Sequence, residues 1–166
     1  RYKTGADNVV LDINGIIEDL SKLLTKSVFE HAHITLNFEP DPHLPPCSGN
    51  KGHLSQVFIN LLKNSVEAMP EGGHIYMTTA YEPDKTGAGG GDIVITIRDD
   101  GPGITEENLA RLFEPGWSSK GPEHSGLGLS ISKDIIDSHN GTINGESRKD
   151  IGTTFRITLP VSGRNP

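Results

Sequence analysis

The segment that most constrains the fold is residues 54–69, LSQVFINLLKNSVEAM, which has the periodicity of an amphipathic helix. Its apolar side chains recur at spacings of three and four residues and define a stripe that faces a core. They are Leu54, Val57, Phe58, Leu61, Leu62, Val66 and Met69. Asn60 and Asn64 fall one turn apart on the opposite face, beside Lys63. Amide oxygens can hold hydrated magnesium while a lysine meets a phosphate, and a plain solvated face is the alternative.

A second feature is the run at residues 92–104, DIVITIRDDGPGI. Its alternating and β-branched apolar residues indicate a strand that ends at Asp99, just before Gly101 and Gly103. Glycines let a backbone turn sharply and pass close to a planar ligand, and a carboxylate at such a turn can accept a hydrogen bond from an exocyclic amine. The amino group of adenine fits that description, and an acidic surface turn is the alternative.

A third feature is the stretch at residues 113–136, FEPGWSSKGPEHSGLGLSISKDII. A loop rich in Gly, Ser and Pro gives way at residues 125–128 to a helix with apolar periodicity. The N–H groups and the dipole of a helix start favour phosphate. Each of the three features is a weak signal alone, but together, in this order and spacing, they indicate a nucleotide site.

The order of these motifs resembles the catalytic domain of sensor histidine kinases, which are members of the GHKL (Bergerat-fold) ATP-binding superfamily. NLLKNSVEAM is similar to the N box, DDGPGI to the G1 box, LFEP to the F box, SGLGLSI to the G2 box, and GTTFRITLP to the final glycine box and closing strand. The resemblance covers residues 10–160 and is strongest to nitrogen-sensor-like kinases.

The resemblance implies a role for each matching position. Asn64 would coordinate the magnesium ion that bridges the ATP phosphates, with Asn60 assisting, and Asp99 would bind the adenine amino group. The other implied nucleotide-binding residues shape the base pocket, anchor the lid over ATP or wrap the triphosphate. They are Gly101, Gly103, Phe113, Ser118, Ser119, Lys120, Ser125, Gly126, Leu127, Gly128 and Thr154. The candidate catalytic residues are Asn60, Lys120 and Lys63, the last of which is equally well read as a solvated lysine.

Two positions depart from the family pattern or leave a role open. Residues 123–125, Glu-His-Ser, stand where many relatives carry small residues, so the lid conformation is left open. Glu67 occupies a position where some kinases carry a base that meets the γ-phosphate, and its role here is also open.

The amide at Asn60 separates two activities. Chaperone, mismatch-repair and topoisomerase relatives carry a glutamate at this point, which activates water, and an amide cannot take that proton. Transfer to a protein acceptor is therefore favoured over hydrolysis. The alternatives are a regulatory nucleotide-binding module or pseudokinase without phosphotransfer, and a serine-directed kinase resembling anti-sigma factors.

The implied acceptor is a histidine in a helical hairpin domain, and none of the seven histidines here stands in the expected sequence setting. We expect an excised domain: residues 1–9 as a linker or the tail of that hairpin, 10–162 as the ATP-binding catalytic domain, and 163–166 as a C-terminal tail. The implied partners are the protein's own dimerisation and phosphoacceptor domain and a cognate response regulator. The isolated domain is expected to be a monomer.

Composition is that of one globular domain, with 33% hydrophobic and 22% charged residues among 166. The net charge of −7 disfavours nonspecific nucleic-acid binding. The lone Cys47 excludes an internal disulfide and a cysteine metal cluster. No hydrophobic span or secretory signal is present, so we expect a cytoplasmic domain without direct membrane contact.

The remaining pattern predicts the other elements. Beyond the helix at 54–69, helices are predicted at residues 14–30, 106–112 and 126–138, strands at 33–38, 74–81, 92–99, 142–146 and 153–159, and a mobile hairpin turn at 82–91. The first helix should bury Ile16, Ile17, Leu20, Leu23, Leu24 and Val28. His139 precedes a helix C-cap signal, where a cationic or dipolar side chain is favourable. Three main helices on one face of a mixed sheet of about five strands make an α+β two-layer sandwich.

Overall fold

The computed structural model describes residues 8–87, 90–117 and 127–161, and its main sheet has five strands in the order β2-β4-β5-β7-β6. They are β2 (Ile34–Glu39), β4 (Gly73–Pro83), β5 (Gly91–Asp99), β6 (Thr142–Arg148) and β7 (Gly152–Pro160). β2 runs parallel to β4, and each other neighbouring pair is antiparallel. The predicted mixed sheet is confirmed.

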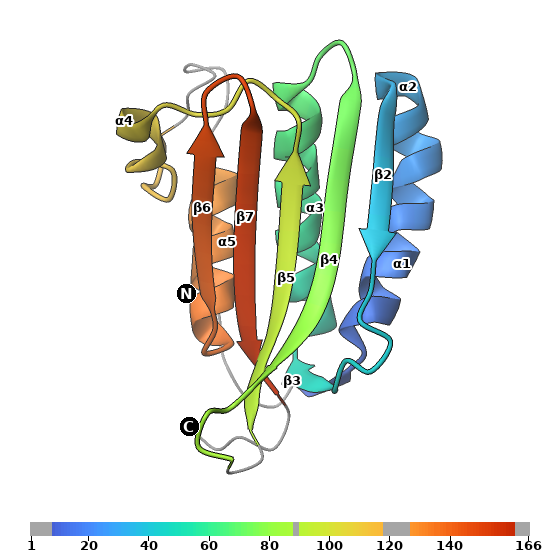
Figure 1. Ribbon diagram of the computed structural model, residues 1–166, viewed down its shortest axis with the longest axis vertical. Helices are drawn as coiled ribbons and strands as arrows, with labels where there is room; N and C mark the ends of the chain where they lie inside the picture. Colours follow the sequence, from blue (N-terminus) through green and yellow to red (C-terminus); the bar gives the residue numbers. More distant parts are fainter. Residues whose placement is uncertain (1–7, 88–89, 118–126, 162–166) are drawn as a thin grey trace.

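Three helices, α1 (Ile13–Leu24), α3 (Lys51–Ala68) and α5 (Leu127–Ser138), cover one face of this sheet, as Figure 1 shows. The predicted α+β two-layer sandwich is therefore confirmed. The core lies between the two layers. β5 contributes Ile93, Ile95 and Ile97 at alternate positions, and each is at most 1% exposed. α3 contributes its predicted stripe, whose members Leu54, Val57, Phe58, Leu61 and Leu62 are also at most 1% exposed. Burying each such side chain contributes about 1.5–3 kcal/mol.

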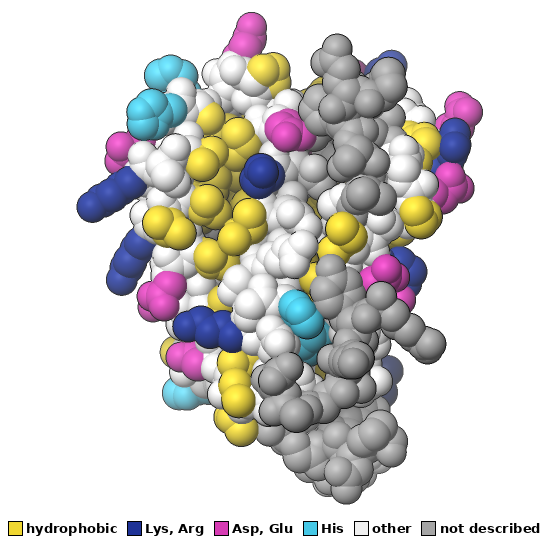
Figure 2. Space-filling model, turned by 180° about the vertical axis from the view of Figure 1, so that it is seen from behind, with side chains coloured by type: hydrophobic (Ala, Val, Ile, Leu, Met, Phe, Trp, Pro, Cys, Tyr) yellow, Lys and Arg dark blue, Asp and Glu magenta, His cyan; other side chains and the backbone are white. Residues whose placement is uncertain are grey.

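The first helix differs from its prediction in two ways. A π-helical turn, η1 (Thr25–Phe29), and the short α2 (Glu30–Ala32) continue α1. The hydroxyls of Ser21, Thr25 and Ser27 donate to the carbonyl four residues earlier, and such bonds loosen a helix. Leu23 is 62% exposed, so its predicted burial is wrong. From behind, apolar side chains gather on the half of the surface that carries α1 and α2 (Figure 2).

Two short strands were not predicted. β1 (Val9–Leu11) pairs antiparallel with β3 (Cys47–Gly49) in a separate two-stranded sheet. Three-residue strands carry too little alternation to be recognised, and their pairing depends on the fold. β3 leads directly into α3, because Asn50 is the N-cap and its side chain accepts a hydrogen bond from the His53 N–H at 2.9 Å.

The short helix α4 (Glu106–Leu109) is shorter than the predicted helix at 106–112. Thr105 caps its start by accepting from the Asn108 N–H at 3.2 Å, and turns follow its end. Leu112, in those turns, is 4% exposed and anchors them to the core. In the described part of the chain, no helix has the length and apolar character that crossing a membrane requires.

Candidate nucleotide-binding site

Asp99, the last residue of β5, is a buried carboxylate held by three hydrogen bonds. Its Oδ1 accepts from the Gly101 N–H at 2.9 Å and from the Thr153 N–H at 3.3 Å, and the Ser65 hydroxyl of α3 also donates to the carboxyl group. Burial raises the pKa of Asp99, the three hydrogen bonds act in the opposite direction, and the nearby charge of Asp100 adds to the rise. Burying a carboxylate costs free energy unless hydrogen bonds compensate for the lost water. The three hydrogen bonds supply that compensation and fix the orientation of the Asp99 carboxyl group.

The loop after Asp99 needs its glycines for close backbone approach. Gly103 has a φ of +78°, and a Cβ there would run into the Arg148 carbonyl. A Cβ at Gly101 would lie 3.0 Å from the Asp99 carboxylate and 3.4 Å from the Ala68 side chain at the end of α3. Gly101 therefore lies against the Asp99 carboxyl group, and Gly103 lies against the Arg148 carbonyl of β6.

The closing strand β7 contributes Thr153 to this cluster, and its neighbour Thr154 is the position that the sequence analysis expected to bind nucleotide. Thr153 and Phe155 are buried and Thr154 between them is half-buried, because neighbouring side chains point to opposite faces of β7. Thr154 therefore points to the sheet face away from the helices, and the residue of β7 that contacts Asp99 is Thr153, through its backbone N–H. The two threonines are adjacent and chemically identical, so the sequence had no local signal to separate them.

The amide pair of α3 occupies a different edge of the same region. Asn60 Nδ2 lies 3.3 Å from the Gly128 carbonyl and 3.4 Å from Ser132 Oγ, both on α5. These contacts fix the nitrogen toward α5, so the oxygen is the atom left to face a ligand. The sequence analysis expected Asn60 on the polar face of its helix, and the structure shows in addition that Asn60 contacts a second helix, α5.

Asn64 and Lys63 complete the polar edge of α3. Asn64 is half-buried, and no hydrogen bond joins its side chain to another of the described residues. Lys63 is exposed. Among the described residues no group of three or more His, Cys, Asp or Glu side chains could hold a metal. A metal here would take amide oxygens together with oxygens from its ligand, which is a pattern that magnesium accepts and zinc does not.

The F-box region packs onto the core of the domain. Phe113 is half-buried against the core, and Trp117 also packs on it. The Arg111 guanidinium lies 5.7 Å from the centre of the Trp117 ring and is paired with Glu114 at 3.1 Å. The predicted ligands Ser118, Ser119, Lys120, Ser125 and Gly126 lie outside the described residues, as does the side chain of Leu127.

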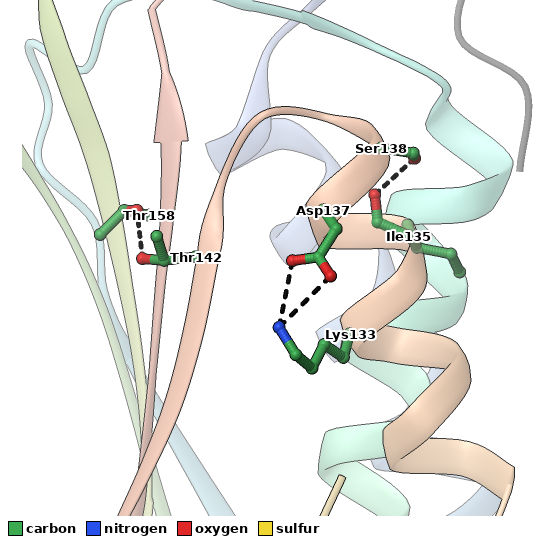
Figure 3. A network of polar contacts seen from close by, with 6 residues as sticks. All are labelled: Lys133, Ile135, Asp137, Ser138, Thr142 and Thr158. Carbon is green, nitrogen blue, oxygen red and sulfur yellow. Dashed lines mark hydrogen bonds and ion pairs between the residues drawn. The ribbon is translucent and has the colours of Figure 1, made fainter. Parts of the chain in front are cut away.

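His139 links the two helices that carry this site. It is 8% exposed, its Nε2 accepts from the Asn50 N–H at 3.0 Å, and its Nδ1 lies 2.7 Å from the Ile135 carbonyl, to which it donates. The ring is therefore neutral, and burial lowers the pKa of His139. The sequence expected a cationic or dipolar side chain at a helix end, and the dipolar form is present. Figure 3 shows this end of α5, where the Ser138 hydroxyl also donates to Ile135.

Comparisons with known proteins show which family the chain belongs to. The family model described as histidine kinase-, DNA gyrase B- and HSP90-like ATPase matches residues 49–163. Sporulation kinase E of Bacillus subtilis is 44% identical over 119 residues, covering 71% of this chain and 15% of that protein. The sensory histidine kinase/phosphatase NtrB of Rhodobacter capsulatus is 40% identical over 141 residues, covering 79% of this chain and 38% of that protein.

A solved structure also matches. The nucleotide-free catalytic domain of histidine kinase ThkA superposes with a TM-score of 0.78 and 30% identity, covering 93% of this chain and 98% of that one. The chain thus spans well under half the length of the two curated relatives, and nearly all of an isolated catalytic domain. It belongs to the histidine kinase-, DNA gyrase B- and HSP90-like ATPase family, and it has the fold of a histidine kinase catalytic domain.

Proposed function

We propose that this chain binds Mg-ATP and donates its γ-phosphoryl group to a histidine on a dimerisation domain outside the chain. The observation that carries the proposal is the buried Asp99 carboxylate, held by hydrogen bonds from three elements at the end of β5. A buried carboxylate with a fixed acceptor direction is suited to recognising an amino group on a planar base. Asp99 is therefore assigned to the adenine amine, with Gly101 and Gly103 giving the ring room.

The other end of the site suits phosphate and magnesium. Asn64, whose amide has no hydrogen-bond partner among the described residues, and Asn60, whose amide nitrogen lies against α5 and leaves its oxygen turned away, are the residues that would hold the ion. Magnesium bound there would neutralise phosphate charge and favour one orientation of the triphosphate. Lys63, exposed on the same helix, and Lys120, outside the described residues, are the candidate cations for the phosphates.

Transfer to histidine fits the site better than hydrolysis. The N-box position that would need a base carries the Asn60 amide, which has no proton-accepting function near neutral pH. The acceptor imidazole nitrogen would form the new bond to phosphorus while the bond to the ADP oxygen breaks. His139 cannot be that acceptor, because both of its ring nitrogens are hydrogen-bonded inside the protein.

The partners follow from this assignment. The two named relatives are a sporulation kinase and a sensory histidine kinase/phosphatase, and one solved ThkA structure, 28% identical to this chain with a TM-score of 0.74, is a complex with the response regulator TrrA. We assign to this chain a phosphoacceptor hairpin domain as direct partner and a response regulator as the next acceptor. The setting proposed for the domain is cytoplasmic, where ATP is available, and alone it is proposed to be a monomer.

Calorimetric titration of Mg-ATP and Mg-ADP tests the proposal, first with the wild type and then with Asp99→Asn. We expect saturable wild-type binding that Asp99→Asn abolishes or weakens strongly. Asp100→Asn is the matched control, because Asp100 is exposed and pairs with His74 at 3.4 Å and Arg98 at 3.6 Å instead of with the site. Radiolabel from γ-labelled ATP should then appear on a supplied hairpin domain. Binding without transfer to any tested hairpin would favour a regulatory nucleotide-binding module.

A further inference from the structure

The loop between β5 and α4, residues 100–104, is fastened from one side by the β6–β7 hairpin. The Ile104 N–H donates to Ser147 Oγ at 2.6 Å, and the Asp150 N–H donates to the Pro102 carbonyl at 2.7 Å. The Thr153 N–H reaches the Asp99 carboxylate itself at 3.3 Å. These hydrogen bonds fix the loop and the Asp99 carboxylate relative to the β6–β7 hairpin, although loop and hairpin are more than forty residues apart in the sequence. We call the hydrogen-bonded set of Asp99, Ile104, Ser147 and Thr153 the frame.

Ser147, on β6, is the centre of this frame. Besides accepting from Ile104, its hydroxyl lies 3.1 Å from the Gly152 carbonyl and 3.0 Å from Thr153 Oγ1. A serine hydroxyl has one donor and two acceptor positions. Donation to Gly152 and acceptance from Ile104 and Thr153 use all three. One side chain therefore connects the far end of the loop with the residue that holds the carboxylate.

We propose that Ser147 is a positioning residue that sets the selectivity of the site for an adenine base, an inference that rests on the proposed function. Ser147 acts through two others: Thr153 directs the acceptor oxygen of Asp99, and Ile104 fixes the path of the loop after Gly103. A hydrogen bond weakens steeply as its angle departs from linearity. A carboxylate whose orientation is not fixed would therefore discriminate poorly between a base that carries an amino group and a base that lacks one. Removal of the hydroxyl also leaves the Ile104 N–H without its partner.

The same hairpin supplies a control for mere strand stability. Thr142 Oγ1 lies 2.6 Å from Thr158 Oγ1, a hydroxyl contact between the same two strands near the other end of the hairpin (Figure 3). Thr142→Ala removes a cross-strand hydroxyl bond without touching the frame around Asp99. A purely structural role for Ser147 predicts equal behaviour of the two alanine variants in base selectivity.

The test compares the affinity of the chain for Mg-ATP with its affinity for the Mg-triphosphate of purine riboside, which lacks the amino group. We expect Ser147→Ala to reduce this ratio by about tenfold, which is the range of one lost hydrogen bond. Ser147→Thr keeps the hydroxyl on a strand-favouring side chain and should restore the wild-type ratio. Thr142→Ala should leave the ratio unchanged.

A second measurement needs no nucleotide. Amide hydrogen exchange at Ile104 should be slow in the wild type and Thr142→Ala, and at least about tenfold faster in Ser147→Ala. A folded Ser147→Ala variant with the wild-type ratio overturns the inference and leaves the proposed function standing. Unprotected Ile104 in the wild type overturns it even if the variant fails to fold. A folded wild type that binds neither triphosphate removes the proposed function and this inference together.

Discussion

The two ends of the candidate site are built differently. At the base end, Asp99 is buried and already engaged by Ser65, Gly101 and Thr153. At the phosphate end, Asn64 is half-buried and without a hydrogen-bond partner in the described part of the chain. The base end is therefore preorganised by the protein, and the phosphate end leaves polar capacity for a ligand to satisfy. We therefore expect the Asp99 end to determine which base is selected, and the Asn64 end to make binding depend on magnesium.

The largest expected effect separates binding from stability at the base end. Asp99→Asn should weaken ATP binding by about 10- to 100-fold, the range of a hydrogen bond to a charged group. Its free energy of unfolding at pH 7 should be equal to or higher than that of the wild type. The folded-state pKa of Asp99 is raised, so its contribution to stability is present below the unfolded pKa of about 3.9 and is lost as pH rises through the folded pKa.

Calorimetry and thermal melts measure these two quantities on one sample. An amide removes the buried charge and keeps an oxygen for the Gly101 and Thr153 N–H groups. A marked fall in melting temperature for Asp99→Asn would mean that the carboxylate is held for the fold instead of for a ligand.

The phosphate end should respond through magnesium. Asn64→Ala should weaken Mg-ATP binding by about tenfold and leave binding in EDTA unchanged, because the role proposed for the Asn64 amide is to bind the ion. Asn144→Ala, on an exposed position of β6, is the matched control. Equal losses with and without magnesium would contradict the metal role of Asn64.

The buried His139, which accepts a hydrogen bond from Asn50, should make the free energy of unfolding decrease at acid pH. The lowered folded-state pKa of His139 means that its contribution is fully present above the unfolded pKa of about 6.5 and is lost as pH falls toward the folded value. The slope there reaches at most about 1.4 kcal/mol per pH unit. Denaturant melts from pH 7.5 to 5.5 should show this slope reduced in His139→Gln and kept in His43→Gln, whose side chain is exposed. If the free energy of unfolding changed with pH equally in both variants, its pH dependence would come from groups other than His139.

The smallest effect concerns the orientation of one amide. Ser132 is fully buried, and its hydroxyl donates to Gly128 at 2.8 Å and lies 3.4 Å from the Asn60 nitrogen. Ser132→Ala should weaken Mg-ATP binding by about two- to fivefold, since one weak contact is lost. Ser138→Ala removes a similar hydroxyl bond farther along α5, to Ile135 at 2.6 Å, and should leave binding unchanged. A loss of the same size in both would indicate a general effect on α5.

The phosphate end was largely predictable from the sequence, because it depends on one helix. The spacing between Asn60 and Asn64 fixes their relation once the apolar stripe is recognised. The contact of Asn60 with α5 was not predictable, because Gly128 and Ser132 are 68 and 72 residues away. Pattern reasoning placed the amides correctly on the helix and could not say which atom of each was already in use.

The base end was predictable only in part. Asp99, Gly101 and Gly103 were identified because they are neighbours in one turn motif. Ser147 and Thr153 gave no signal, since their roles depend on how a hairpin packs against a loop 43 to 54 residues earlier. The choice between Thr153 and Thr154 depends on the register of β7, which is fixed only when the strand pairs with β5 and β6.

The position of β7 has a consequence for how the chain is made. β7 ends at Pro160 and is the last strand among the described residues, yet it lies inside the sheet between β5 and β6. A nascent chain that stops before Gly152 has two unpaired strand edges and no Thr153 N–H for Asp99. Copies that are unfinished or cut before β7 therefore lack one of the groups that hold the Asp99 carboxylate. On the proposed function, a chain must be synthesised through β7 before it can select a nucleotide.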